Sequence, residues 1–342
     1  MRTQASRTAT GKDAGSSELE RQYRHAKTGA LVADLSGLGR LSITGKDAID
    51  LLHRLTTQDL LSLRVDQGTA ALFVTAKGRI LDRVLFARLD DRILGTTGPG
   101  RATAVREWIE RYTFREEVVV EDRTASHGTL GLFGAGAPAL AAGLFGEAAA
   151  RGSLHEPRRV AWQGTSAILA RTDPLAGEGY LLTSDRAALH LLQGELLHPE
   201  RGAMVAGPEC LEVLRIEAGQ PAADRELTEE FNPWEAGLRD AVSLNKGCYV
   251  GQEVIARLNT YQKVSKFLAR LAWEGREMPE GRAALEIAGQ PVGTLTSAAR
   301  VPASTRVVAL GYLAGEQSTP GLAVDVVWDD RRARGIVEGV AR

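Results

Sequence analysis

Cysteine is scarce in this chain: only Cys210 and Cys248 occur among its 342 residues. Two cysteines exclude a disulfide framework and fit a reducing compartment. The six histidines are scattered, and neither they nor the cysteines have the spacing of a metal-ligand cluster. The sequence therefore predicts no metal ligands and no permanently bound Fe-S cluster.

Long apolar runs are also missing. No window approaches the roughly 18 apolar residues that a membrane span requires, so no membrane contact is expected. The net charge is only -1, with 42 Lys and Arg against 43 Asp and Glu, and no basic stripe interrupts this balance. Direct binding of nucleic acid is therefore not expected. These absences together predict a cytoplasmic protein.

Residues 1–17 are rich in Thr, Ser, Ala and Gly, and they contain Arg2, Arg7 and Lys12. This composition leaves an organelle transit peptide as an alternative. Because the stretch has no apolar helical face, we expect a disordered tail instead.

The rest of the chain has the composition of an ordinary globular protein, with 44% apolar and 25% charged residues. Its length predicts two or three domains. Strand and helix patterns alternate without the regular period of a Rossmann fold, which predicts an α+β protein with mixed or antiparallel sheets. After residue 260 the pattern changes to short strands that predict a small β-barrel, at 265–273, 283–287, 291–296, 306–313, 323–328 and 335–340.

These patterns divide the chain into a tail and three domains. A polar helix is predicted over 18–27, and an amphipathic helix over 45–55, where apolar residues recur at helical spacing. The predicted domains are a first α+β domain formed by 18–125 and 200–262, a second α+β domain over 126–199, and a C-terminal barrel over 263–342.

The stretch that looks chemical is NKGCYVGQE, at residues 245–253. Cys248 lies between Gly247 and Gly251, which permit sharp backbone turns, and residues from 252 onward predict a helix. Just before a helix N-terminus, the helix dipole and the nearby Lys246 would favour a thiolate and lower the pKa of the thiol. The alternative is a small hydrophobic residue in a buried turn, because free cysteine is often buried.

With these pieces in order, the chain resembles the folate-binding superfamily of the glycine-cleavage T-protein, and within it the YgfZ/Iba57 (CAF17-like) branch. The resemblance covers nearly everything after the N-terminal tail. Its most specific motif is KGCYVGQE, which matches the YgfZ pattern KGCYxGQE at every position. The motifs that carry the resemblance lie at 45–48, 56–59, 77–78, 214–221, 246–253 and 292–297.

The resemblance implies a ring of mixed α/β domains and a barrel around a channel that holds tetrahydrofolate or a one-carbon derivative. It also implies assembly or repair of Fe-S client proteins, including enzymes that modify tRNA. The leading hypothesis is a tetrahydrofolate-binding accessory factor in which Cys248 acts as a reactive or transient-ligand thiolate. The alternatives are a folate-dependent aminomethyl- or methyltransferase and a folate-sensing adaptor without catalysis, so catalysis stays an open question.

Several residues are candidates for these roles. By resemblance, Asp82 and Arg83 occupy the place where aminomethyltransferases carry two successive aspartates, one of which acts next to the folate N10. A pterin edge suits a carboxylate, the aminobenzoyl ring an aromatic wall, and the glutamate tail a cation. The catalytic candidates are Cys248, Lys246 and Asp82, and the cofactor-binding candidates are Asp82, Glu178, Arg215, Glu217, Tyr249, Gln252 and Glu253.

Each cofactor candidate also has a structural interpretation. Asp82 is equally well a solvated strand residue, and Glu178 lies in a segment one residue shorter than its T-protein counterpart. Arg215 and Glu217 are equally well members of surface ion pairs. Tyr249 is equally well a core residue, as is Trp234, the other aromatic residue considered for a pterin wall. Gln252 and Glu253 are equally well first-turn helix residues that complement the helix dipole.

Overall fold

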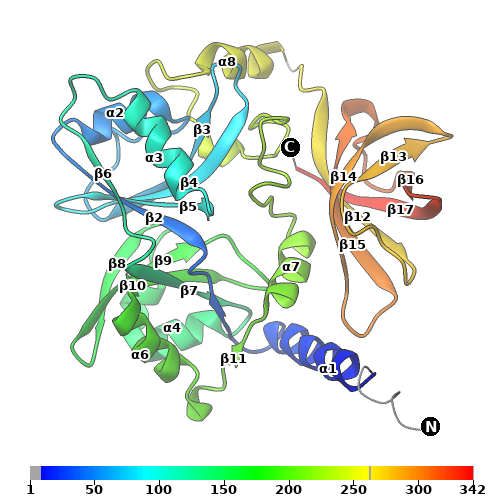
Figure 1. The fold of residues 1–342 in the computed structure, drawn as a ribbon, viewed down its shortest axis with the longest axis horizontal. Helices are drawn as coiled ribbons and strands as arrows, with labels where there is room; N and C mark the ends of the chain where they lie inside the picture. The colour runs from blue at the N-terminus through cyan, green and yellow to red at the C-terminus, as the bar shows by residue number, and fades with distance from the viewer. Residues whose placement is uncertain (1–8, 262, 342) are drawn as a thin grey trace, which may run out of the picture.

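The described residues, 9–261 and 263–341, of this computed structural model form two sheets, a closed barrel and the helices that accompany them. The two sheets lie on one side of the molecule and the barrel on the other, with α7 between them (Figure 1). The mixed and antiparallel α+β architecture predicted from the sequence is confirmed.

The first sheet carries two helices on one face. In α2, Leu51, Leu52 and Leu55 are buried at the predicted helical spacing. The sheet and its helices enclose a core of their own. In sheet order the strands are β3 (Gln67–Val74), β4 (Ile80–Arg88), β5 (Ile93–Pro99), β2 (Leu38–Thr44) and β6 (Val119–Asp122), and the helices are α2 (Ala48–Leu55) and α3 (Ala102–Arg111).

The second sheet has six strands and its own helical cover. Asp185 caps α6 by accepting a hydrogen bond from the Ala188 amide, which is why the helix begins there. In order the strands are β11 (Met204–Val205), β1 (Leu31–Asp34), β7 (His127–Phe133), β10 (Gly179–Asp185), β9 (Thr165–Thr172) and β8 (Pro157–Trp162), and the helices are α4 (Ala137–Phe145), α5 (Glu147–Ala150) and α6 (Arg186–Leu196).

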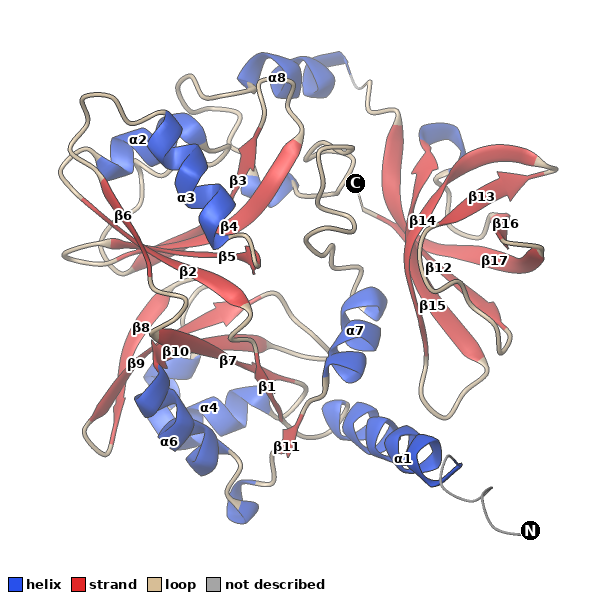
Figure 2. Cartoon of the chain, viewed as in Figure 1, coloured by secondary structure: helices blue, strands red, loops and turns tan. Residues whose placement is uncertain are grey.

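The two sheets face each other, and their helices lie on the outer sides (Figure 2). β1 differs from the predicted domain boundaries, which placed residues 18–125 in the first domain. It pairs antiparallel with β7 and parallel with β11, so it belongs to the second sheet. Because both partners come from later in the chain, this pairing has no local sequence signal.

The barrel closes with the six predicted strands. Every neighbouring pair is antiparallel, and the inward side chains form a separate core. The strand order is β12 (Lys266–Glu274), β15 (Arg306–Ala314), β14 (Gln290–Arg300), β13 (Ala283–Ile287), β16 (Ala323–Trp328) and β17 (Arg331–Val340).

Three helices lie outside the two sheets and the barrel, which are called the three lobes of the molecule. α1 begins at Ala9, so residues 9–17 of the expected tail are helical, and residues 1–8 lie outside the described part of the chain. Pro208 is at the start of α7, where its missing amide is not needed. The helices are α1 (Ala9–Ala26), α7 (Pro208–Glu217) and α8 (Gln252–Tyr261), and the 3-10 turns are η1 (Pro199–Arg201), η2 (Arg239–Ala241) and η3 (Gly315–Gln317).

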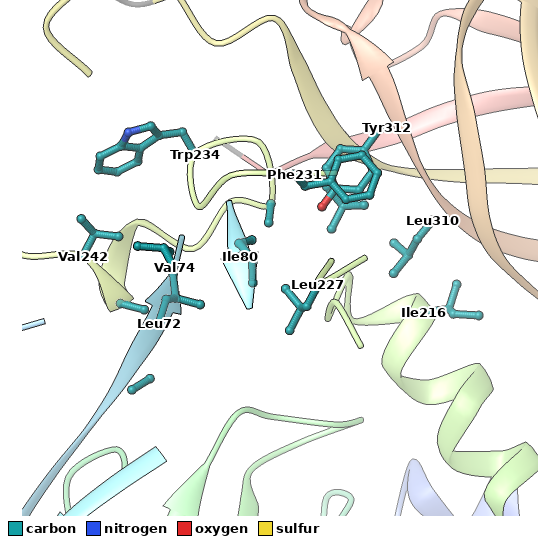
Figure 3. Packing of buried hydrophobic residues seen from close by; sticks show 14 of the residues in the cluster. Leu72, Val74, Ile80, Ile216, Leu227, Phe231, Trp234, Val242, Leu310 and Tyr312 are labelled. Carbon is teal, nitrogen blue, oxygen red and sulfur yellow. The ribbon is translucent and has the colours of Figure 1, made fainter. Parts of the chain in front are cut away.

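A central hydrophobic cluster joins the first sheet to the barrel. It combines side chains of β3 and β4, α7, the loop after α7 and the barrel strands β12 and β15 (Figure 3). The Phe231 ring stacks on the Tyr312 ring, with centroids 3.5 Å apart and planes 13° apart. This cluster fixes the loop at residues 218–251, which leads to the cysteine motif.

Candidate functional site

The cysteine motif lies between the end of α2 and the turn of the β3-β4 hairpin. Gly251 has φ +79°, and a Cβ there would meet the Thr75 carbonyl oxygen at 2.5 Å, so this position requires glycine. Ile255 of α8 is fully buried, and its carbonyl accepts a hydrogen bond from the Trp234 indole at 2.8 Å. The predicted helix from residue 252 is confirmed, and it is held tightly against the hairpin.

Lys246 is buried and donates hydrogen bonds to carbonyl groups at and beyond the end of α2. Its ammonium donates to the carbonyls of His53, of Thr56 (2.7 Å) and of Gln58 (2.9 Å). It also lies 4.8 Å from the centre of the Tyr249 ring. Burial lowers the pKa of Lys246 to about 8. Its three donors are thus directed at backbone oxygens, which differs from the thiolate-stabilising role expected beside Cys248.

These contacts join two motifs that are far apart in the sequence. The amide of Val250 donates to the Arg54 carbonyl at 3.2 Å, and the Thr57 hydroxyl donates to the Ala241 carbonyl at 2.6 Å. The segment at 56–59 and the cysteine motif at 246–253 therefore form one structural unit. Carbonyls at a helix C-terminus need such donors when they are buried.

Cys248 is exposed, whereas Cys210 is fully buried. Three residues separate Cys248 from Gln252, the first residue of α8, so the thiol precedes the helix by almost one turn. Burial raises the pKa of Cys210 to about 11, which makes that thiol unreactive at neutral pH. Of the two thiols, only Cys248 is accessible to a second molecule.

The other candidates of the motif have local roles. Tyr249 belongs to the central cluster, and burial raises its pKa to about 12. The Gln252 side chain accepts the Tyr249 amide at 3.3 Å across the start of α8. Glu253 is exposed in the first turn of α8. These contacts match the structural interpretations of the three residues.

Asp82 is a buried carboxylate on β4, 2% exposed, which excludes the solvated interpretation. It accepts the Gly98 amide at 3.0 Å. Burial raises its pKa to about 6, although this hydrogen bond and the charge of Arg101 act in the opposite direction. A Cβ on Gly98 would lie 2.8 Å from the Ala223 Cβ, so the carboxylate lies where β5 meets the loop after α7. A carboxyl group that titrates near neutrality suits proton transfer or polarisation of a ligand.

Arg83, which follows Asp82, has a separate environment. Its guanidinium pairs with Asp173 at 2.7 Å. Burial and the charge of Arg83 lower the pKa of the neighbouring His155, so its imidazole is neutral at pH 7. The position that carries a second aspartate in aminomethyltransferases, by the resemblance, thus holds a paired cation here.

The three remaining candidates do not gather at Asp82. Glu178 is half exposed and contacts Arg171 at 3.3 Å and the Tyr180 hydroxyl at 3.0 Å. Glu217 accepts hydrogen bonds from Tyr23 (2.7 Å) and Lys27 (3.1 Å) of α1.

Arg215 belongs to a buried network rather than to a surface ion pair. It pairs with Glu212 at 2.6 Å and with the fully buried Glu226 at 3.0 Å, and it donates to the Ser297 hydroxyl of β14 at 2.6 Å. The structure therefore shows Arg215 connecting α7 to the barrel.

A cavity of about 420 Å³ between the two sheets was not predicted from the sequence. Its walls come from β2, β4 and β5 on one side and from β7 to β10 on the other. The signal present in the sequence is the pair Arg40 and Ser42, polar residues at alternating positions of β2 that are both buried. Alternation alone predicts that such residues face solvent, because only the packing of two sheets covers that face.

Two facing sheets and a separate barrel define the structural class of the aminomethyltransferase T-proteins. The glycine cleavage aminomethyltransferase T of Bartonella henselae has this fold, with a TM-score of 0.82 over 94% of this chain and 88% of that chain, at 22% identity. The chain belongs to the GCVT family, because the model of the GCVT N-terminal domain matches residues 10–246.

Named relatives agree with this family. The chain is 32% identical over 301 residues to the Arabidopsis thaliana protein "Putative transferase At1g60990, chloroplastic", covering 87% of this chain and 68% of that protein. It is 27% identical over 299 residues to the aminomethyltransferase of Streptomyces avermitilis, covering 85% and 80%. Aminomethyltransferases of the family use tetrahydrofolate as substrate or cofactor, in agreement with the expected cofactor.

Two further expectations concern the surroundings of the protein. Over residues 9–261 and 263–341, no helix is long and apolar enough to cross a membrane. One relative is named chloroplastic, so the cytoplasmic location stays a prediction.

Proposed function

We propose that this protein is a tetrahydrofolate-binding factor of the YgfZ/Iba57 branch that assists assembly or repair of Fe-S client proteins. Cys248 acts in it as a transient thiolate ligand. The observation that carries the proposal is the exposed thiol on a fastened loop: Lys246, Val250 and Gly251 on both sides of it are fixed to α2 and to the β3-β4 hairpin. A thiol so presented is available to an incoming iron atom.

The possible metal ligands in the described part of the chain support a transient role for Cys248. Within the described part of the chain, no group of three or more His, Cys, Asp and Glu side chains lies close enough to hold a metal ion. A cluster at Cys248 would therefore take its other ligands from a client protein or from a small thiol. Such sharing permits release of the cluster.

Complementation tests the thiol. Cys248→Ser and Cys248→Ala variants are introduced into a strain lacking the native protein, and the activity of a 4Fe-4S enzyme is measured. We expect both variants to lose complementation. Cys210→Ala is the matched control, because it removes the other cysteine, which is buried. Full complementation by both Cys248 variants would reject the thiol role.

Tetrahydrofolate binding is tested separately by titration of the purified wild type and of Cys248→Ala. We expect equal affinities, because the proposed thiol role is independent of the folate contacts. Loss of function with retained binding separates the two roles, whereas absence of binding to the wild type contradicts the folate part of the proposal.

A second candidate function, aminomethyl or methyl transfer to or from tetrahydrofolate, is favoured by Asp82. Its buried carboxyl titrates near neutrality, as the polarising group of such a reaction requires. Purified protein with tetrahydrofolate and an aminomethyl donor should then form methylene-tetrahydrofolate, and Asp82→Asn should abolish this turnover. A rate no higher than that of the blank rejects the transferase.

If neither catalysis nor the thiol is required, the folate-sensing adaptor remains. Its mark is a set of captured client proteins that changes with folate. Pull-down from a lysate with and without tetrahydrofolate measures this change, and an unchanged set argues against sensing.

A further inference from the structure

A buried arginine without a carboxylate partner lines the cavity between the two sheets. Arg40 of β2 is 4% exposed. Its Nη2 donates to the carbonyls of Ser36 (2.9 Å) and Thr124 (3.1 Å), whereas Nε and Nη1 have no acceptor. Burial lowers the pKa of Arg40, yet a guanidinium stays protonated at neutral pH. The cavity wall thus contains a positive charge with unused donors.

Ser42 provides a second unpaired group on the same wall. It lies two residues after Arg40, and alternate residues of a strand point to the same face. Its side chain is 1% exposed, and its Oγ has no hydrogen-bond partner. Leu41, between the two, packs into the core of the first sheet. Buried polar groups in folded proteins are nearly always satisfied, so two unpaired neighbours indicate a missing partner.

The acidic residues near Arg40, Asp122 and Asp34, act on it through their charge without forming an ion pair with it. Asp34 accepts the Ser36 amide and Asp122 accepts the Thr124 amide, each at 2.8 Å. Of the two aspartates that line the cavity, Asp91 pairs with Arg92, and Asp185 caps α6.

The other arginines of the cavity wall have partners. Among the ion pairs of residues 9–261 and 263–341, each of them contacts an acid while Arg40 contacts none. The pairs are Arg92 with Asp91, Arg123 with Glu121, Arg159 with Asp90 and Arg171 with Glu178.

The remaining walls combine polar side chains, among them Thr96, Ser166, Thr183 and Ser184, with apolar ones. Leu85 and Leu94 come from the first sheet, and Ile168 and Leu181 from the second. His155 also lines the cavity, with an unpaired Nδ1, and its backbone abuts Gly68 of β3. In the first sheet the lining of the cavity runs from β4 across β5 to β2, which is two strand spacings or roughly 10 Å. Its shape suits an elongated ligand with an apolar body.

We propose that this cavity binds a small organic anion, a carboxylate or phosphate ester on an apolar body, whose anionic group is held by Arg40 and Ser42. The neutral His155 accepts a hydrogen bond from a donor at the far end of the ligand. The inference goes beyond the proposed function. Asp82, the candidate for one-carbon transfer, lies on the same face of β4 as Val84 and Phe86, which is the face turned away from this cavity.

The test uses three matched probes that contain bromine: 4-bromobenzoate, 4-bromophenyl phosphate and the neutral 4-bromobenzamide. Their affinities for the full-length protein are measured by calorimetry. We expect at least one acid to bind about tenfold tighter than the amide, because charge-assisted hydrogen bonds to guanidinium are strong. Which acid binds tighter distinguishes a carboxylate from a phosphate ligand.

Variants then assign the anion contact. Arg40→Gln should raise the Kd of the preferred acid by about tenfold, and Ser42→Ala should raise it by a smaller factor. Arg159→Gln is the control, because this arginine lines the same cavity but is exposed and paired; its Kd should stay within about twofold. Arg40→Lys replaces the glutamine variant if that one fails to fold; it keeps the charge but loses the planar fork of donors, so it should still raise the Kd.

The bromine also locates the ligand without any variant. Anomalous diffraction from crystals of the wild type grown with the preferred acid should place bromine between the two sheets. Equal binding of amide and acids, an unchanged Kd in the Arg40 variants, bromine outside the cavity, or no acid binding below about 10 mM would each overturn the proposal. None of these results depends on Cys248 or on tetrahydrofolate.

Discussion

At the scale of single residues, burial gives the two charged candidates opposite roles. The ammonium of Lys246 donates hydrogen bonds to backbone carbonyls, so this residue stabilises the loop. Asp82 accepts hydrogen bonds from the backbone of Gly98 and of Arg83, and burial still raises its pKa, so it is available for chemistry. The sequence identified both residues, but it could not separate these roles, because both depend on neighbours far along the chain.

We predict that Lys246→Met lowers the free energy of unfolding by about 2 to 4 kcal/mol, because it leaves three carbonyls without a donor. Urea denaturation measures the change. Lys77→Ala, at the exposed hairpin turn, is the control and should shift it by no more than about 0.5 kcal/mol. Equal effects of the two substitutions would contradict the anchoring role.

Asp82 should make stability depend on pH. Its pKa is about 6 in the folded protein against an ordinary 3.8, so the folded state binds more protons between these values. Stability therefore falls as pH rises from 4 to 7, by about 3 kcal/mol from this group. Asp82→Asn removes the titration, so the difference between wild type and variant should change by that amount. Parallel pH curves would show that Asp82 does not titrate in this range.

At the scale of elements, α7 is tied to the barrel by charge. Arg215 of α7 reaches Glu226 and Ser297, while Glu217 on the same helix contacts α1. One helix thus contacts the N-terminal helix and the C-terminal lobe at once. The periodicity of residues 208–219 predicts the helix, but not the partners of its polar side chains.

We predict that Arg215→Met destabilises the protein by about 3 to 5 kcal/mol, because Glu226 is left as a buried charge without its cation. Adding Glu226→Gln should recover part of the loss. Both changes are measured by urea denaturation. Arg282→Ala removes an exposed pair with Glu230 and should cost no more than about 1 kcal/mol. If the double variant loses as much free energy of unfolding as the two single variants together, or more, the coupling between Arg215 and Glu226 is refuted.

At the scale of the whole molecule, the lobes share one hydrophobic cluster. Phe231, from the loop after α7, stacks on Tyr312 of the barrel, and Leu72 of the first sheet belongs to the same cluster. The loop that presents Cys248 is therefore held by all of these parts together.

We predict that Phe231→Ala lowers the free energy of unfolding by about 3 to 5 kcal/mol, since it opens a cavity between the loop and the barrel. Thermal unfolding followed by circular dichroism measures the loss. Phe114→Ala is the matched control, because that ring is 82% exposed, and it should be nearly neutral. A neutral Phe231→Ala would mean that the lobes are joined by other contacts.

The sequence by itself determined the elements whose signal is local. Helical spacing of leucines predicted α2, six short alternating strands predicted the barrel, and glycines around Cys248 predicted a tight loop before a helix. Such patterns depend on neighbours a few residues away, and the motif at 246–253 is contiguous, so both can be read along the chain.

Only the tertiary structure decided which side chains are free to act. In the structure Lys246 points to α2, and Asp82 is buried next to the loop after α7. The strand β1 pairs within the second sheet, and Arg40 lies between the two sheets with unpaired donors. Each of these facts depends on contacts between segments far apart in the chain. Burial and pairing set the charge and the reach of a side chain, and neither is encoded within a local stretch.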